Sequence, residues 1–150
     1  MRKILFIVLA ALIAGCASVV GQTSSDFDRA REKWQDANIS HYRYELSIGC
    51  FCIFSQEMPL VIEVKDGEAL SIEYKSGKEI DAASMELFQR YATIDKIFAE
   101  LENAREGDAD TVTVTYDDAY GYPKEVSIDF EQQAADEEIY LTISNFEALP

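Results

Sequence analysis

Histidine and basic residues are scarce in this chain of 150 residues. It has one histidine, His41, and 13 lysine and arginine residues against 28 aspartate and glutamate residues, which gives a formal net charge of −15. Contacts to nucleic-acid phosphates need clustered lysine and arginine, so this balance excludes a nucleic-acid binder. It also argues against a domain that lies flat on an anionic membrane. We interpret the acidity as a solvated surface, with a basic partner or a cation as the alternative.

Sequence motifs for common catalytic chemistry are missing. There is no Gly-x-Ser-x-Gly stretch, and one histidine leaves little room for a Ser-His-Asp site. There is no Gly-x-x-x-x-Gly-Lys loop for phosphate, and the acidic residues lack EF-hand spacing. The sequence therefore predicts no enzyme, no cofactor and no dedicated metal site.

One apolar run lies near the start, at residues 4–14, directly after Arg2 and Lys3. It is too short to span a bilayer, which takes a helix of about 20 residues. A basic start, a short apolar core and small residues before a cleavage point are typical of a secretory signal peptide. The sequence Ile13-Ala14-Gly15-Cys16 resembles the lipobox of bacterial lipoproteins, in which the cysteine becomes the lipidated N-terminus.

This resemblance implies a signal peptide at 1–15 and a lipid on Cys16, with an ordinary signal peptide as the alternative. The small and polar residues that follow, up to 24, are expected to form a flexible tether. Residues 25–150 are long enough for a single globular domain with its own core. Ala17 stands where lipoproteins retained in the inner membrane carry Asp, which favours the outer membrane, with the domain facing the periplasm.

Apolar residues at helical spacing predict two main helices. The first is expected to open at Ser25, with Trp34, the only tryptophan, as its anchor on the sheet. The second is expected to begin near Thr93 and to end at Gly107. A shorter helix is expected within residues 84–91.

Alternation of apolar and polar residues with a period of two predicts six strands. Their order with the main helices is α-βββ-α-βββ, and only the join between the halves needs a crossover. We therefore predict an α+β fold, with one antiparallel sheet of about six strands and both main helices on one face. The expected strands are residues 41–49, 60–65, 70–75, 110–116, 124–130 and 139–143.

The second and third predicted strands meet at Asp66-Gly67, which is a hairpin signal. A two-residue loop would pair Ile62 with Ser71 and put the two apolar faces on opposite sides of the sheet. A three-residue loop that includes Lys65 pairs Ile62 with Leu70 instead. We therefore predict the longer loop, with a bulge at Gly67.

Two cysteines remain after Cys16 is assigned to lipid, namely Cys50 and Cys52. An even number in an exported protein favours a disulfide, and a turn after Gly49 would bring the two Cα atoms within bridging range. One alternative is a redox dithiol, although the usual Cys-x-x-Cys at a helix start is absent. The other is a metal site for Cu(I) or Zn, which needs further ligands. We predict a structural disulfide.

The segment 116–123 combines acidic and aromatic residues. Its simplest interpretation is a hairpin connection in which Gly121 has a positive φ and the acids are solvated. Tyrosine is enriched at interfaces, so the segment is also a candidate contact surface for an envelope protein or glycan. The candidate residues are Asp117, Asp118, Tyr120 and Tyr122.

An ordered set of short motifs runs through the domain. The motifs are Trp34, Tyr42-Arg43-Tyr44, Cys50-Phe51-Cys52, Asp66-Gly67, Thr93-Ile94-Asp95, Tyr116-Asp117 and Gly121-Tyr122-Pro123. The set covers roughly residues 26–146 and resembles a family of bacterial exported lipoproteins classed only as a domain of unknown function. The resemblance implies an exported lipoprotein and supplies no catalytic residues. We interpret the chain as a non-enzymatic, lipid-anchored binding domain; the alternative is a thiol-dependent redox or metal-binding role through Cys50 and Cys52.

Overall fold

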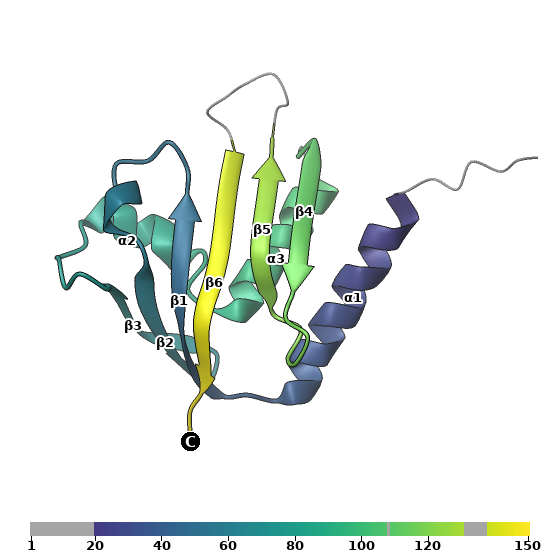
Figure 1. Cartoon of the computed structure of the whole chain (residues 1–150), viewed down its shortest axis with the longest axis horizontal. Coiled ribbons are helices and arrows are strands. Elements are labelled where there is room, and N and C mark those ends of the chain that lie inside the picture. The colour runs from purple at the N-terminus through teal and green to yellow at the C-terminus, as the bar shows by residue number, and fades with distance from the viewer. Residues whose placement is uncertain (1–19, 108, 131–137) are drawn as a thin grey trace, which may run out of the picture.

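The computed structural model describes residues 20–107, 109–130 and 138–150, in which one antiparallel sheet packs against helices (Figure 1). This confirms the predicted α+β class and the single sheet of six strands. None of the helices in these residues is long and apolar enough to cross a membrane. The elements are α1 (Val20–Ala37), β1 (His41–Gly49), η1 (Ser55–Glu57), β2 (Leu60–Lys65), β3 (Glu68–Tyr74), α2 (Ala82–Gln89), α3 (Ile94–Glu106), β4 (Thr111–Tyr116), β5 (Pro123–Asp129) and β6 (Glu138–Ala148).

The predicted order with two packed helices is not matched, because the shorter helix expected within residues 84–91 is α2, which packs into the core as a third helix, and the turn η1 separates β1 from β2. Helix α2 begins at the N-cap Asp81, whose carboxylate accepts hydrogen bonds from the backbone N–H groups of Ala83 and Ser84. It buries Phe88, whose ring lies 4.9 Å from that of Phe54 between centroids. The cap gives this short segment a fixed start, and burial of Phe88 makes it a full part of the core.

The strand order is β3-β2-β1-β6-β5-β4, so two antiparallel meanders meet at the pair β1–β6 in the centre of the sheet. Helices α2 and α3 connect the outer strand of the first meander to the outer strand of the second, behind the sheet in Figure 1. The opposite face of the sheet carries mostly polar side chains. The core lies between the sheet and the helices, with alternate residues of four strands pointing into it: Tyr42, Tyr44, Leu46, Ile48, Leu60, Ile62, Val64, Val126, Ile128, Leu141 and Ile143.

Helix α1 begins at Val20, five residues before the predicted start at Ser25. Residues 20–24 of the predicted tether are therefore helical, and the rest of the tether, 16–19, lies outside the described residues. A serine that can cap a helix does not have to begin one. Extending an existing helix by a turn costs much less than nucleating it, and no proline interrupts this stretch.

The predicted three-residue hairpin loop between β2 and β3 is wrong. Lys65 pairs with Glu68, and the turn consists of Asp66 and Gly67, with φ of 52° and 83°. Positive φ at both central positions is the geometry of a tight hairpin turn. The conflict between the two apolar faces is resolved in β3, where Leu70 is an extra residue without an opposite partner, and Ile62 pairs with Ile72. A bulge restores the alternation there.

Strand β6 runs to Ala148, well beyond its predicted end at Ile143. A second bulge explains the error, because Asn145 and Phe146 together lie opposite the single residue Tyr44. Asn145 has a φ of 50°, a conformation that asparagine tolerates better than most residues. The bulge turns Phe146 toward the helices, where its ring stacks on Tyr122 at 4.7 Å between centroids.

Candidate functional site

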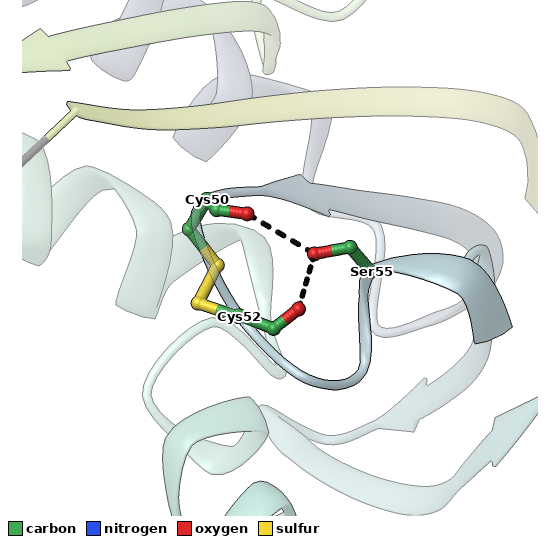
Figure 2. Close-up of a disulfide and its surroundings, with 3 residues drawn as sticks. All are labelled: Cys50, Cys52 and Ser55. Carbon is green, nitrogen blue, oxygen red and sulfur yellow. Dashed lines mark hydrogen bonds between the residues drawn. A yellow bond between two sulfur atoms is a disulfide. The ribbon is translucent and has the colours of Figure 1, made fainter. Parts of the chain in front are cut away.

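Strand β1 leads directly into the pair Cys50 and Cys52, which form the predicted disulfide with a Cα–Cα distance of 5.2 Å. Figure 2 shows how the bridge is fixed to the turn that follows it. The Ser55 hydroxyl lies 2.7 Å from the carbonyl oxygen of Cys52 and 3.1 Å from that of Cys50, so the two backbone carbonyls share this one hydroxyl donor. The Ser55 N–H also donates to the Cys52 carbonyl. This loop therefore has a defined shape.

The loop exposes two large apolar side chains. Phe51 is 88% exposed and Ile53 is 94% exposed, more than any other large hydrophobic residue described. We call Phe51, Ile53 and the disulfide between Cys50 and Cys52 the apolar tip. Residues 47–56 contain no charged side chain, a signal in the sequence that points to this loop, although neither Phe51 nor Ile53 was among the predicted site residues.

Two hollows border the apolar tip. One, of about 350 Å³, lies between the disulfide, helix α2 and the ends of β5 and β6. Its lining is mostly apolar: Ile48, Cys50, Phe51, Cys52, Leu87, Tyr91, Phe130, Glu138 and Ile139. The other, of about 410 Å³, is lined by Phe51, Ile53 and the polar residues Ser55 and Gln56 beside the disulfide. Such surfaces suit an apolar ligand better than a charged one.

The two tyrosines of the contact surface predicted within residues 116–123 differ in their exposure. Tyr122 is only 7% exposed and belongs to the core, so it offers no contact surface. Burial, followed by the charge of Asp117, raises the pKa of Tyr122 to about 12. Tyr120 is 37% exposed, and its ring lies 5.6 Å from that of Phe146. Of the two tyrosines expected to face solvent, only Tyr120 does so.

The acids of this segment mainly shape the turn. An Asp117 carboxylate oxygen accepts hydrogen bonds from the backbone N–H groups of Ala119 and Tyr120, at 2.9 and 2.8 Å. The Asp118 carbonyl accepts one from the Lys33 ammonium on α1. No group of three or more His, Cys, Asp or Glu side chains suited to a metal is found in the residues described. Asp117 thus holds the hairpin in its observed conformation.

His41 lies at the opposite end of β1 from the cysteines. Its Nε2 is 2.9 Å from a Glu63 carboxylate oxygen, and its Nδ1 is 2.9 Å from the carbonyl oxygen of Pro150. The structure therefore does not bring the single histidine to Cys50 and Cys52, which removes it as a shared metal ligand. It instead joins β1 to β2 and to the residues after β6.

The hydrogen bond to Glu63, followed by that to Pro150, raises the pKa of His41 above its usual 6.5. A proton bound more tightly in the folded state stabilises it fully below pH 6.5, and this contribution is lost as the pH rises through the folded-state pKa. We expect the free energy of unfolding, measured with urea, to fall as the pH rises above 6.5. In His41→Gln the slope should vanish, since no other histidine titrates there; a wild-type slope of zero or of opposite sign contradicts the assignment.

The disulfide closes a very small ring, so it restricts the unfolded chain only slightly. We expect Cys50→Ser combined with Cys52→Ser to lower the free energy of unfolding by less than about 2 kcal/mol. Amide hydrogen exchange in residues 50–57 should accelerate, because the loop loses the disulfide that restricts its motion. Urea unfolding and exchange mass spectrometry measure the two effects. A loss above about 3 kcal/mol would show that the bridge supports the whole domain.

The fold and the tip together define a small α+β domain with one face of its sheet covered, the other open, and a disulfide-bridged apolar loop at one end. The chain belongs to a family of unknown function, DUF6174, whose model matches residues 26–148. No curated protein and no solved structure matches the chain. The match runs from α1 to the last residue of β6, which confirms the expected membership in a family of unknown function.

Proposed function

We propose that this protein is a non-enzymatic interaction domain, anchored by a lipid on Cys16 in the bacterial outer membrane and facing the periplasm. It makes its contact through the apolar tip. The observation that carries the proposal is the exposure of Phe51 and Ile53 on a loop held by a disulfide. The partner is an apolar surface of the envelope.

The lipid anchor is supported by the sequence Ile13-Ala14-Gly15-Cys16 after a short apolar run. Mass spectrometry of the N-terminal peptide of the native protein tests it. The expected peptide begins at acylated Cys16. A peptide that begins elsewhere, or that begins at Cys16 without an acyl chain, overturns the anchor.

The contact at the tip is supported by energetics. Each large apolar side chain left in water forgoes about 1.5–3 kcal/mol of burial free energy. The neighbouring Phe54 is 6% exposed and packs on α2, so the loop divides its apolar residues between core and solvent. A loop already held by Cys50, Cys52 and Ser55 loses little freedom on binding, which favours affinity. The apolar side chains favour a protein or lipid surface over a glycan, which needs many polar contacts.

The thiol-dependent alternative has one observation in its favour, since both cysteines border the hollow of about 410 Å³ at the surface. A disulfide there is open to a reducing partner. Intact mass after alkylation under native conditions separates the two functions. A mass lower by two hydrogens with no alkylation fits the structural bridge. Two readily alkylated thiols, or a bound metal, favour the thiol role.

The proposed contact is tested by photo-crosslinking in intact cells. We expect Phe51→benzoylphenylalanine to give, after illumination, discrete adducts with the protein or lipid that the tip contacts. The matched control is Leu70→benzoylphenylalanine, because Leu70 is also a large exposed residue, at 60%, but lies on β3 away from the disulfide. Equal adduct yields at both positions, or none at residue 51, would refute a contact at the tip.

A further inference from the structure

We infer that the apolar tip docks into the same bilayer that carries the Cys16 lipid, so that Phe51 and Ile53 lie in its interfacial region. This inference rests on the lipid anchor of the proposed function and names the apolar surface that the tip meets. The domain would then be held at two points, with a fixed orientation.

The geometry of α1 and β1 places the tip and the start of α1 on one side of the molecule. Helix α1 has 18 residues and is about 27 Å long, and β1 has nine residues and is about 30 Å long. The chain runs along α1, turns within residues 38–40 and returns along β1. In Figure 1 the start of α1 and the loop after β1 both lie on the side of the molecule opposite the C-terminus, separated along its long axis.

The chain between the anchor and α1 is short. Cys16 precedes Val20 by four residues, and four residues of extended chain reach at most about 14 Å. A lipid on Cys16 therefore keeps the N-terminal end of α1 close to the headgroups. Because the tip lies on the same side of the molecule as this helix terminus, it faces the same membrane.

The chemistry of the tip suits a lipid surface. Residues 47–56 bring no charge into the interface. The first acid after them, Glu57, is paired with Lys78 at 2.7 Å. Glu138, which borders the hollow beside the disulfide, accepts a hydrogen bond from the Tyr140 hydroxyl at 2.6 Å. The tip has no lysine or arginine, so its attraction is apolar and does not depend on anionic lipid.

The size of the tip also favours the bilayer over a protein partner. A stable protein interface buries about 1,200–2,000 Å² in total. Two exposed side chains on a small loop fall short of that. A weak apolar contact is sufficient when the lipid already holds the domain at the surface, because the second contact is then intramolecular.

The test uses the full lipidated protein reconstituted into phosphatidylcholine vesicles, with Phe51→benzoylphenylalanine, Ile53→benzoylphenylalanine and the control Leu70→benzoylphenylalanine. After illumination, lipid adducts are counted by mass spectrometry. We expect positions 51 and 53 to exceed position 70 by about tenfold. Replacing a third of the lipid by phosphatidylglycerol should not raise this ratio, since the chain is acidic. Thermal unfolding confirms that each variant is folded.

The outcomes distinguish this inference from the proposed function. Lipid adducts at 51 and 53 well above those at 70 support docking into the bilayer. Equal yields at the three positions overturn it. If vesicles give equal yields while position 51 forms protein adducts in cells, the interaction domain stands and its partner is a protein. An unacylated Cys16 removes the anchor and this inference together.

Discussion

Replacing Trp34 with alanine is expected to lower the free energy of unfolding by about 3–5 kcal/mol, the range for deleting a large buried aromatic side chain. Trp34 is 5% exposed and meets the ring of Tyr42 edge-on at 5.3 Å and that of Phe146 at 5.9 Å between centroids. Its indole N–H donates to an Asp95 carboxylate oxygen at 3.3 Å. The side chain thus joins α1 to the sheet and to α3. Urea unfolding followed by circular dichroism measures the loss.

Trp34→Phe is the matched control for this prediction. It keeps an aromatic ring in the site but removes the donor to Asp95 and part of the buried area. We expect about 1–2 kcal/mol of destabilisation, well below the alanine value. If Trp34→Ala costs less than about 1 kcal/mol, α1 contributes little to the core, and the anchoring role is wrong.

Gly121→Ala is expected to destabilise the domain by more than about 2 kcal/mol, through strain and a clash acting together. Gly121 has a φ of 81°, and an added Cβ would lie 2.5 Å from the Ala30 carbonyl oxygen and 3.0 Å from the Lys33 Cβ on α1. A backbone carbonyl within a helix cannot move away easily. We expect the β4–β5 hairpin to separate from α1, which urea unfolding and hydrogen exchange would detect.

Gly67→Ala is the control that measures the strain of a positive φ without a steric clash. Gly67 has a nearly identical φ of 83°, but nothing lies within 4 Å of an added Cβ. We expect only the cost of a positive φ, about 1 kcal/mol. Equal effects of the two substitutions would contradict a close approach between the hairpin and α1.

The strands were predictable because alternation of apolar residues reports directly which face of a sheet is buried. His41–Gly49 shows this in full, with Tyr42, Tyr44, Leu46 and Ile48 all buried. Helix α3 was predictable because Thr93 caps it, accepting a hydrogen bond from the Lys96 N–H, and because its apolar residues have helical spacing. Local patterns of this kind determine each element without reference to the rest of the chain.

The errors arose where a single residue can change the register. A turn of two residues with a bulge at Leu70 and a turn of three residues both align the apolar faces of β2 and β3, so the sequence pattern does not choose between them. The bulge at Asn145 has the same effect in β6. It packs Phe146 against the core although its position in the alternation predicts the polar face.

The site was only partly predictable, because exposure of loop residues depends on distant contacts. Tyr122 was expected at the surface of a hairpin connection, but it is covered because this connection packs on α1 and Phe146. Phe54 and Ile53 are neighbours of similar hydrophobicity, yet one is buried against α2 and the other is 94% exposed. Only the packing of α2 distinguishes them.

The central position of β6 determines when the sheet can be completed. During synthesis from the N-terminus, β1, β2 and β3 are made long before residues 138–148, which among the described strands form the one that joins them to β5 and β4. Until then no described strand joins the two meanders, and the edge of β1 that pairs with β6 lacks its partner. The complete sheet can therefore form only after residues 138–148 have been made, so its two halves share no described strand until most of the chain is present.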